Sequence, residues 1–269
     1  QTADGRNLEH LSVFSESNWT ADGKAFAAVM RRIREIDSYQ RTVIMMQVEN
    51  ESGLFGQARD HSKAAEQAFA QNAPQELMAF LRKHRNDLAP QQFRDIWAAG
   101  GYKTEGTWRD IFGADAEEVF QTWYNARYID SVAAAGKAEY PLPMFVNAWQ
   151  DGGNYPNAGD YPSGGPVAKM IPVWRAAAPH IDVIAPDIYL PDFKGICDKY
   201  VSMGNPRLVP EAAANVANLF YAIAEHDAIC YSPFGVDGGR LTPDSPLGES
   251  YRLLADLMPF IITYQGTGK

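Results

Sequence analysis

The chain has 269 residues, of which 46% are hydrophobic and 21% charged, so its composition is that of a globular protein with a large core. Its formal net charge of −9 argues against nucleic acid as a partner, because nucleic-acid phosphates require a basic surface. No apolar run approaches the length of a membrane span, and residues 1–20 lack a signal-peptide pattern, so we expect no membrane partner.

The first predicted strand ends in an unusual group of polar residues. A polar stretch, residues 1–17, and an amphipathic helix, residues 22–36, precede it. Residues 43–46 are a continuous apolar run, which is typical of a parallel strand covered on both faces. Gln47, Glu49, Asn50 and Glu51 follow at once, and Gly53 turns the chain. Polar groups at the carboxyl end of a buried parallel strand are where α/β barrels place their chemistry.

A long section without strands separates this strand from the next. It contains predicted helices at residues 74–88 and 93–99, and glycines and aromatic residues mark the rest as loop. We expect the section to build or cover a site, as long connections after barrel strands do. A strong helix follows at residues 116–135, and we interpret its Trp123 and Tyr124 as core residues.

Four more strands are expected in the second half of the chain. Each is followed by a helix, and a long loop separates the first of these strands from its helix. The strands are residues 144–149, 181–189, 207–211 and 228–235, and the helices are residues 167–178, 193–202, 212–226 and 246–264. Residues 150–166 form a Gly/Pro/Asn-rich loop that either lines a substrate site or is plain surface. Such alternation predicts a parallel sheet with right-handed crossovers. Polar residues at the end of each strand in turn favour a barrel over a doubly wound sheet, in which ligands gather at one switch point.

Two glutamates stand at predicted strand ends, Glu51 and Glu211. If the first strand is the fourth of an eight-stranded barrel, these glutamates end strands four and seven, which face each other across the barrel mouth. A retaining glycosidase uses two carboxyl groups in this way, one as acid/base and one as nucleophile.

Residues 47–53, Gln-Val-Glu-Asn-Glu-Ser-Gly, resemble the Q-[VI]-E-N-E-[YF]-G signature of glycoside hydrolase family 35, the β-galactosidases. The resemblance implies that Glu51 is the acid/base, that Asn50 binds the 2-hydroxyl of the sugar, and that Glu49 contacts the sugar or a residue beside it. It also implies that Glu211 is the nucleophile. Ser52 departs from the signature, as does the Ala-Ala-Ala-Asn run after Glu211.

Four further residues are expected to contact the substrate. Tyr189 resembles the tyrosine after strand six that hydrogen-bonds the nucleophile in this clan of enzymes. Asn147 and Trp149 match only by position, as sugar contacts from strand five. Tyr231, which ends strand eight together with Phe234, is also a candidate contact, although the absence of a tryptophan there departs from the family.

The expected fold class is α/β, a (β/α)8 TIM barrel of which residues 1–269 carry strands four to eight. Residues 53–115 are then a long insertion after strand four, and strands one to three and any following β-domains are absent from the sequence. Because five strands alone would leave two apolar sheet edges, we expect the chain to be a segment of a longer protein or to associate with the missing half. A self-contained open sheet is the alternative.

The expected activity is that of a retaining exo-β-glycosidase, most simply a β-galactosidase, with a carbohydrate as its partner. Another β-glycosidase acting on arabinosides, glucosides or mannosides is the alternative, as is a catalytically silent carbohydrate-binding barrel. The mechanism needs no cofactor and no metal, and a homo-oligomer stays open. The family resemblance favours a periplasmic or secreted location.

Cysteines and histidines carry little of this hypothesis. Cys197 and Cys230 lack metal-ligand spacing, and we expect two buried thiols rather than a disulfide. No histidine ends a predicted strand, as a metal-dependent hydrolase would require. Among the five histidines, His61, next to Asp60, is the one retained as a candidate substrate contact.

Overall fold

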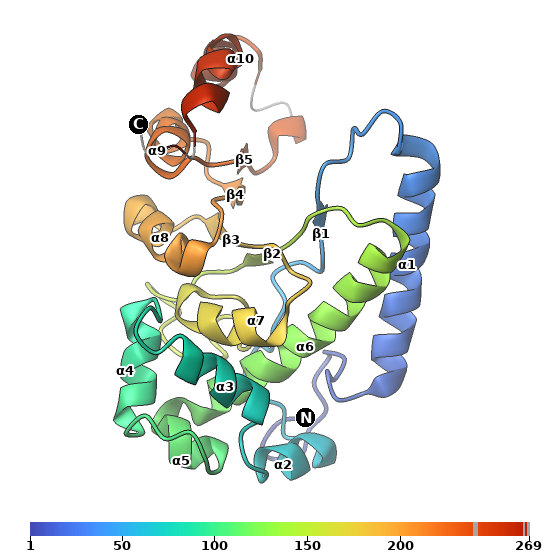
Figure 1. Ribbon diagram of the computed structural model, residues 1–269, viewed down its shortest axis with the longest axis vertical. Coiled ribbons are helices and arrows are strands. Elements are labelled where there is room, and N and C mark those ends of the chain that lie inside the picture. The colour runs from blue at the N-terminus through green and yellow to red at the C-terminus, as the bar shows by residue number, and fades with distance from the viewer. Residues whose placement is uncertain (239–241, 266, 268–269) are drawn as a thin grey trace.

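The strands form one parallel sheet in which each strand pairs with the next along the chain. The computed structural model describes residues 1–238, 242–265 and 267, and the sheet order is β1-β2-β3-β4-β5. Figure 1 shows this sheet curled like half of a barrel, with β1 on one side and β5 on the other. The strands are β1 (Met46–Gln47), β2 (Met144–Ala148), β3 (Val183–Ile188), β4 (Val209–Ala212) and β5 (Tyr231–Pro233). The expected α/β class with a parallel sheet is therefore confirmed.

Helices surround the sheet, and most predicted helices are present with shifted ends. They are α1 (Glu16–Asp37), α2 (Lys63–Phe69), α3 (Gln75–Lys83), α4 (Gln91–Ala99), α5 (Trp108–Phe112), α6 (Ala116–Glu139), α7 (Ile171–Ala177), α8 (Phe193–Tyr200), α9 (Val216–His226) and α10 (Pro246–Tyr264). Helix α9 starts later than predicted, because Ala212 belongs to β4 and Asn215 caps the helix by accepting from Asn218 N. In the described part of the chain, no helix has the length and apolar character needed to cross a bilayer.

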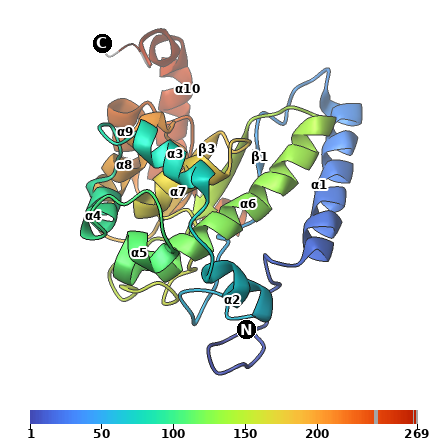
Figure 2. The same ribbon diagram turned by 60° about the horizontal axis from the view of Figure 1, so that its bottom comes forward.

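The section between β1 and β2 is more helical than its glycines and aromatics indicated. Helices α2 and α5 lie where a loop was expected. Each has a side-chain cap: Ser62 accepts from Ala65 N, and Thr107 and Asp110 form a reciprocal capping box. Figures 1 and 2 show α2 to α5 gathered beside α6 and α7, on the outside of the half-barrel.

The expectation that residues 43–46 are covered on both faces is wrong. Only Met46 and Gln47 form a regular strand, and Ile44 is 69% exposed. The reason is that β1 pairs with β2 alone among the described strands, which leaves its other edge and part of its surface uncovered.

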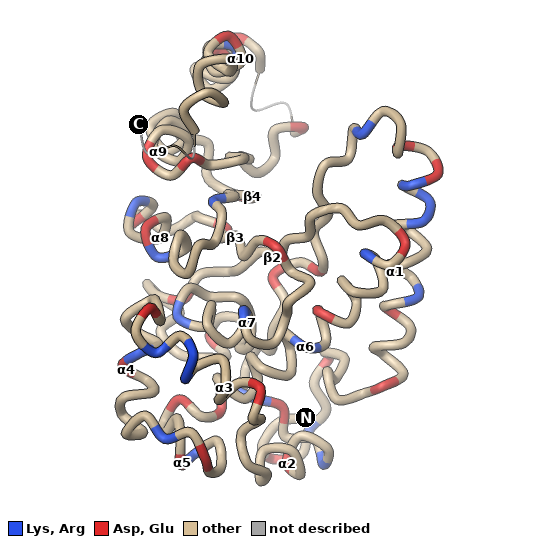
Figure 3. Tube along the Cα trace, in the orientation of Figure 1, with Lys and Arg blue, Asp and Glu red and all other residues tan. Residues whose placement is uncertain are grey.

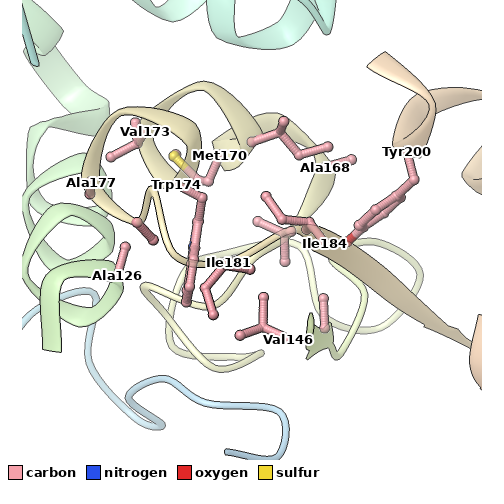
Figure 4. Close-up of a cluster of buried hydrophobic side chains, with 14 of the residues drawn as sticks. Ala126, Val146, Ala168, Met170, Val173, Trp174, Ala177, Ile181, Ile184 and Tyr200 are labelled. Carbon is pink, nitrogen blue, oxygen red and sulfur yellow. The ribbon is translucent and has the colours of Figure 1, made fainter. Parts of the chain in front are cut away.

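The main core lies between the sheet and the helices α6 and α7. Figure 4 shows Trp174 of α7 facing Ile181, with Val146 and Ile184 of the sheet beside it. Trp123 is also buried, with 2% of its surface exposed, which confirms its predicted core role. Cys197 and Cys230 are free thiols, as expected, but only Cys197 is buried, whereas Cys230 is partly exposed.

Replacing Trp174 by alanine tests how much this core stabilises the half-barrel. The side chain is 1% exposed, so Trp174→Ala leaves a large cavity and should lower the free energy of unfolding by about 3–5 kcal/mol. Urea denaturation followed by circular dichroism measures the change. Tyr39, which is 98% exposed, offers the matched control, and Tyr39→Ala should change the unfolding free energy by less than about 0.5 kcal/mol.

Candidate active site

The carboxyl ends of β1 to β4 meet around one cavity of about 310 Å³. In a parallel sheet these ends share one edge, and side chains that follow different strands therefore come together there. Figure 3 shows acidic positions beside β2 in the middle of the molecule, and both acidic and basic positions on the surrounding helices. The residues lining the cavity are Glu51, Trp149, Gln150, Tyr155, Asp187, Tyr189, Leu190 and Glu211.

The two predicted catalytic glutamates, Glu51 and Glu211, both line this cavity although 160 positions separate them in the sequence. Glu211 lies in β4 directly opposite Asp187 of β3 in the strand register. Glu51 follows β1 by four residues and reaches the cavity from a bent segment. The structure therefore brings the pair together, as expected for glutamates at the ends of two strands.

The bend after β1 places Glu51 through unusual backbone conformations. Glu49 has φ 61° and Glu51 has φ 43°, in the left-handed region that non-glycine residues rarely adopt. Such conformations each cost about 1–3 kcal/mol and collect at functional sites. Gly53 completes the turn with φ 149°, and a Cβ there would lie 2.6 Å from Pro162.

Asn147 holds this bend from below. Its Oδ1 accepts a hydrogen bond from Glu51 N at 2.9 Å, and its Nδ2 donates to Asn50 Oδ1 at 3.0 Å and to Asp187 Oδ2 at 2.7 Å. The residue is 1% exposed. This corrects its expected role as a sugar contact. The side chain lies beneath the cavity wall, because the residues that follow β1 and β3 cover this end of β2.

Asn50 and Glu49 line an adjoining cavity of about 410 Å³, which shares Glu51 with the first. Gln47 Nε2 donates to Asn50 Oδ1 at 3.0 Å, so that oxygen already has two donors. The Asn50 amide therefore presents its N–H groups to a ligand. Burial raises the pKa of Glu49 above its usual value, and the nearby Asp22 charge raises it further.

Tyr189 lies next to Glu211, as the resemblance implies. Its hydroxyl donates to Glu211 Oε2 at 2.9 Å. Burial and the Glu211 charge raise the pKa of Tyr189 above its usual value, so the hydroxyl keeps its proton at neutral pH. The bond occupies one carboxylate oxygen of Glu211 and leaves the other available for chemistry.

Burial and mutual repulsion raise the pKa values of two of the three clustered carboxyl groups. Asp187 is 2% exposed, and its burial, together with the nearby Glu211 and Glu51, raises its pKa to about 9. Burial also raises the pKa of Glu51, and the Glu211 charge adds to this rise while a hydrogen bond from Asp187 opposes it. A carboxyl group with a raised pKa is suited to act as a general acid near neutral pH.

Aromatic side chains form one wall of the site. Trp149 contacts Phe55 and Tyr155 edge to face, each with ring centroids 5.4 Å apart. Backbone bonds between Leu54 and Ser163 tie the loop after β1 to the loop after β2, and so hold these rings together. Tyr155 makes the loop of residues 150–166 part of the cavity, in agreement with the first of the two interpretations of that loop. Exposed aromatic faces of this kind suit the apolar faces of sugar rings.

Tyr231 is not placed at this cavity, which corrects its expected location. It is the first residue of β5 rather than the last, its hydroxyl donates to Ala213 O at 2.6 Å, and its ring packs on Phe193. The His61 side chain also lies outside this cavity, with its Nδ1 2.8 Å from Glu66 Oε1. Helices α2 to α5 contribute no residue to the cavity, whereas Phe55, at the start of the same section, packs on Trp149.

Four lining residues had no role assigned from the sequence, namely Asp187, Gln150, Tyr155 and Leu190. A signal for Asp187 was available, because it follows the apolar residues 183–186 near the carboxyl end of a predicted parallel strand. Among the described residues, no group of three or more His, Cys, Asp or Glu side chains is arranged to hold a metal ion. No protein-family model matches the chain, and no curated protein matches it. Function must therefore be argued from the residues of the site.

Proposed function

We propose that the protein is a retaining exo-β-glycosidase with β-galactosidase as its activity. The observation that carries this proposal is that Glu51 and Glu211, which follow different strands, line one cavity in which Tyr189 is hydrogen-bonded to Glu211. Family 35 is proposed from the resemblance of residues 47–53, which fall at the bend that presents Glu51.

In the proposed reaction, Glu51 starts protonated and Glu211 ionised. Glu211 attacks the anomeric carbon while Glu51 donates its proton to the leaving oxygen, which gives a covalent glycosyl-enzyme. Glu51, now a carboxylate, removes a proton from water, and that water displaces Glu211 with net retention of configuration. The raised pKa of Glu51 supports its role as the acid, and the Tyr189 bond supports a fixed orientation for Glu211.

The proposal includes a full (β/α)8 barrel, with β1 to β5 as strands four to eight. Its support is that β1 and β5 each pair on one side only among the described strands, and that apolar side chains such as Ile44 are exposed next to the free edge. Three further parallel strands with their helices would cover both edges and complete the rim of the cavity.

The stereochemical outcome tests this function. When the full-length protein hydrolyses an aryl β-galactoside, proton NMR should show the β-anomer of galactose first, followed by slow mutarotation. Initial release of the α-anomer would contradict the double displacement. Aryl glucosides, mannosides and arabinosides run in parallel identify the preferred sugar by their kcat/KM values. The exposed-surface variant Glu225→Gln on α9 serves as the matched control and should behave as the unmodified protein does.

A further inference from the structure

A third carboxyl group, that of Asp187, lies between the two proposed catalytic glutamates. It is 2% exposed, its backbone pairs with Glu211, and its side chain lines the same cavity as that of Glu51. Its electrostatic neighbours in the described chain are the carboxyl groups of Glu51 and Glu211, with no cation among them. A buried carboxylate in such surroundings is strongly disfavoured.

The hydrogen bonds of Asp187 leave one of its two oxygens free to carry a proton. Oδ2 accepts from Asn147 Nδ2 at 2.7 Å, whereas Oδ1 receives no hydrogen bond from any donor in the described residues. Two ionised carboxylates cannot hydrogen-bond to each other, because neither has a proton to donate. A hydrogen bond between Asp187 and Glu51 therefore requires a proton, and Oδ1 of Asp187 is the oxygen free to carry it.

We propose that Asp187 is a positioning residue that remains protonated and donates a hydrogen bond to Glu51, which fixes the orientation and ionisation of that glutamate. The inference rests on the proposed function of Glu51 as acid/base. It goes further in linking β2 and β3 to that glutamate, because Asn147 orients Asp187 and Asp187 in turn orients Glu51. Charge-assisted bonds from a neutral carboxyl to a carboxylate are strong, so the bond is strongest in the step where Glu51 is ionised.

Two substitutions at Asp187 separate this role from a merely structural one. Asp187→Asn keeps both bonds, since the new amide oxygen accepts from Asn147 and the new N–H group donates to Glu51. Asp187→Ala removes the donor to Glu51. Asp187→Ala should therefore lose on the order of 10- to 100-fold in kcat, the size expected for a hydrogen bond to a charged group. Asp187→Asn should recover most of that loss, and Asp256→Ala, an exposed aspartate of α10, is the matched control.

The decisive readout is the titration of Glu51, measured by carbon-13 NMR of the side-chain carboxyl in full-length protein labelled at glutamate. The groups facing the Asp187–Glu51 pair are Glu211 from β4, Tyr189 after β3 and Tyr200 from α8, and they are the same in all variants. Loss of the donor should raise the pKa of Glu51 in Asp187→Ala, and Asp187→Asn should bring it back towards the original value.

Each outcome bears on the proposal. The same Glu51 titration in Asp187→Ala as in the unmodified protein would overturn it, as would an Asp187→Asn protein as impaired as Asp187→Ala, since that would mean an ionised Asp187 is required. Because the titration of Glu51 is measured without turnover, its result does not depend on whether the protein is a glycosidase. A protein that hydrolyses no glycoside but shows the titration shift would refute the glycosidase and keep the hydrogen bond.

Discussion

Glu211→Ala should lower kcat for aryl β-galactosides by at least about 10⁴-fold, the scale of loss seen when a catalytic nucleophile is removed. The reason is that the other two carboxyl groups lining the cavity cannot take its place: Glu51 is the proposed acid/base, and Asp187 is only 2% exposed. Initial rates with a nitrophenyl galactoside measure the effect. The fold should persist, because Glu211 is half-buried at the cavity and its removal leaves the main core intact.

Azide sharpens the test of Glu211→Ala. A small external nucleophile can enter the space left by the carboxylate and attack the anomeric carbon, so azide should restore turnover and give the α-galactosyl azide. Residual activity within tenfold of the unmodified protein would contradict the assignment of Glu211. The matched control is again Glu225→Gln, which removes one exposed carboxylate from α9 without touching the cavity.

Glu51→Gln should reduce hydrolysis of galactosides with poor leaving groups by roughly 10²–10⁴-fold, the usual contribution of general acid catalysis. Dinitrophenyl galactoside needs little protonation, so its glycosylation step should be much less affected. Azide should then accelerate the second step, the breakdown of the glycosyl-enzyme, because azide, unlike water, needs no general base. The product should be the β-galactosyl azide. Comparing kcat/KM for the two leaving groups separates this role from simple loss of binding.

The pH profile gives the same variant a second readout. In the unmodified protein, the raised pKa of Glu51 should keep it protonated to a higher pH than an ordinary glutamate, which extends the alkaline limb of kcat/KM. Glu51→Gln removes the titrating group, so this limb should disappear for the activated substrate. An unchanged alkaline limb in Glu51→Gln would assign the acid to another residue.

The sequence was sufficient to predict the edge of the sheet at which the site lies. Glu51, Trp149, Tyr189 and Glu211 all lie at or shortly after the carboxyl ends of predicted strands, and the parallel alternation of strands and helices brings such positions to one edge. This inference needs only the order of the elements, which the hydrophobic pattern supplies.

Burial within the site could not be predicted in the same way. Asn147 and Trp149 both lie at the end of β2, yet Asn147 is 1% exposed and bonded on both sides, whereas Trp149 faces the cavity. Tyr231 was assigned to a strand end, but β5 begins at this residue. A shift of one or two residues in a strand boundary reverses or relocates a side chain, and pattern alone does not fix boundaries to that accuracy.

The protonation of Asp187 was not predicted either, because it depends on how the side chain is packed. Asp187 is acidic in the sequence, and only its packing against Glu51, Glu211 and Asn147 reveals that it is held neutral. Helix α5, in contrast, carried a readable signal, since Thr107 and Asp110 have the spacing of a capping box.

The central claim is that Glu211 forms a covalent bond to the sugar, and trapping that bond tests it most directly. The full-length protein is incubated with an activated 2-deoxy-2-fluoro-β-galactoside, and its mass is measured before and after, with peptide mapping of any adduct. The fluorine slows both the formation and the hydrolysis of the glycosyl-enzyme. The good leaving group restores the rate of formation alone, so the glycosyl-enzyme accumulates. We predict a single fluorosugar on Glu211, absent from Glu211→Ala. A label on any other residue, or none with galacto-, gluco- and manno-configured reagents alike, would contradict the account.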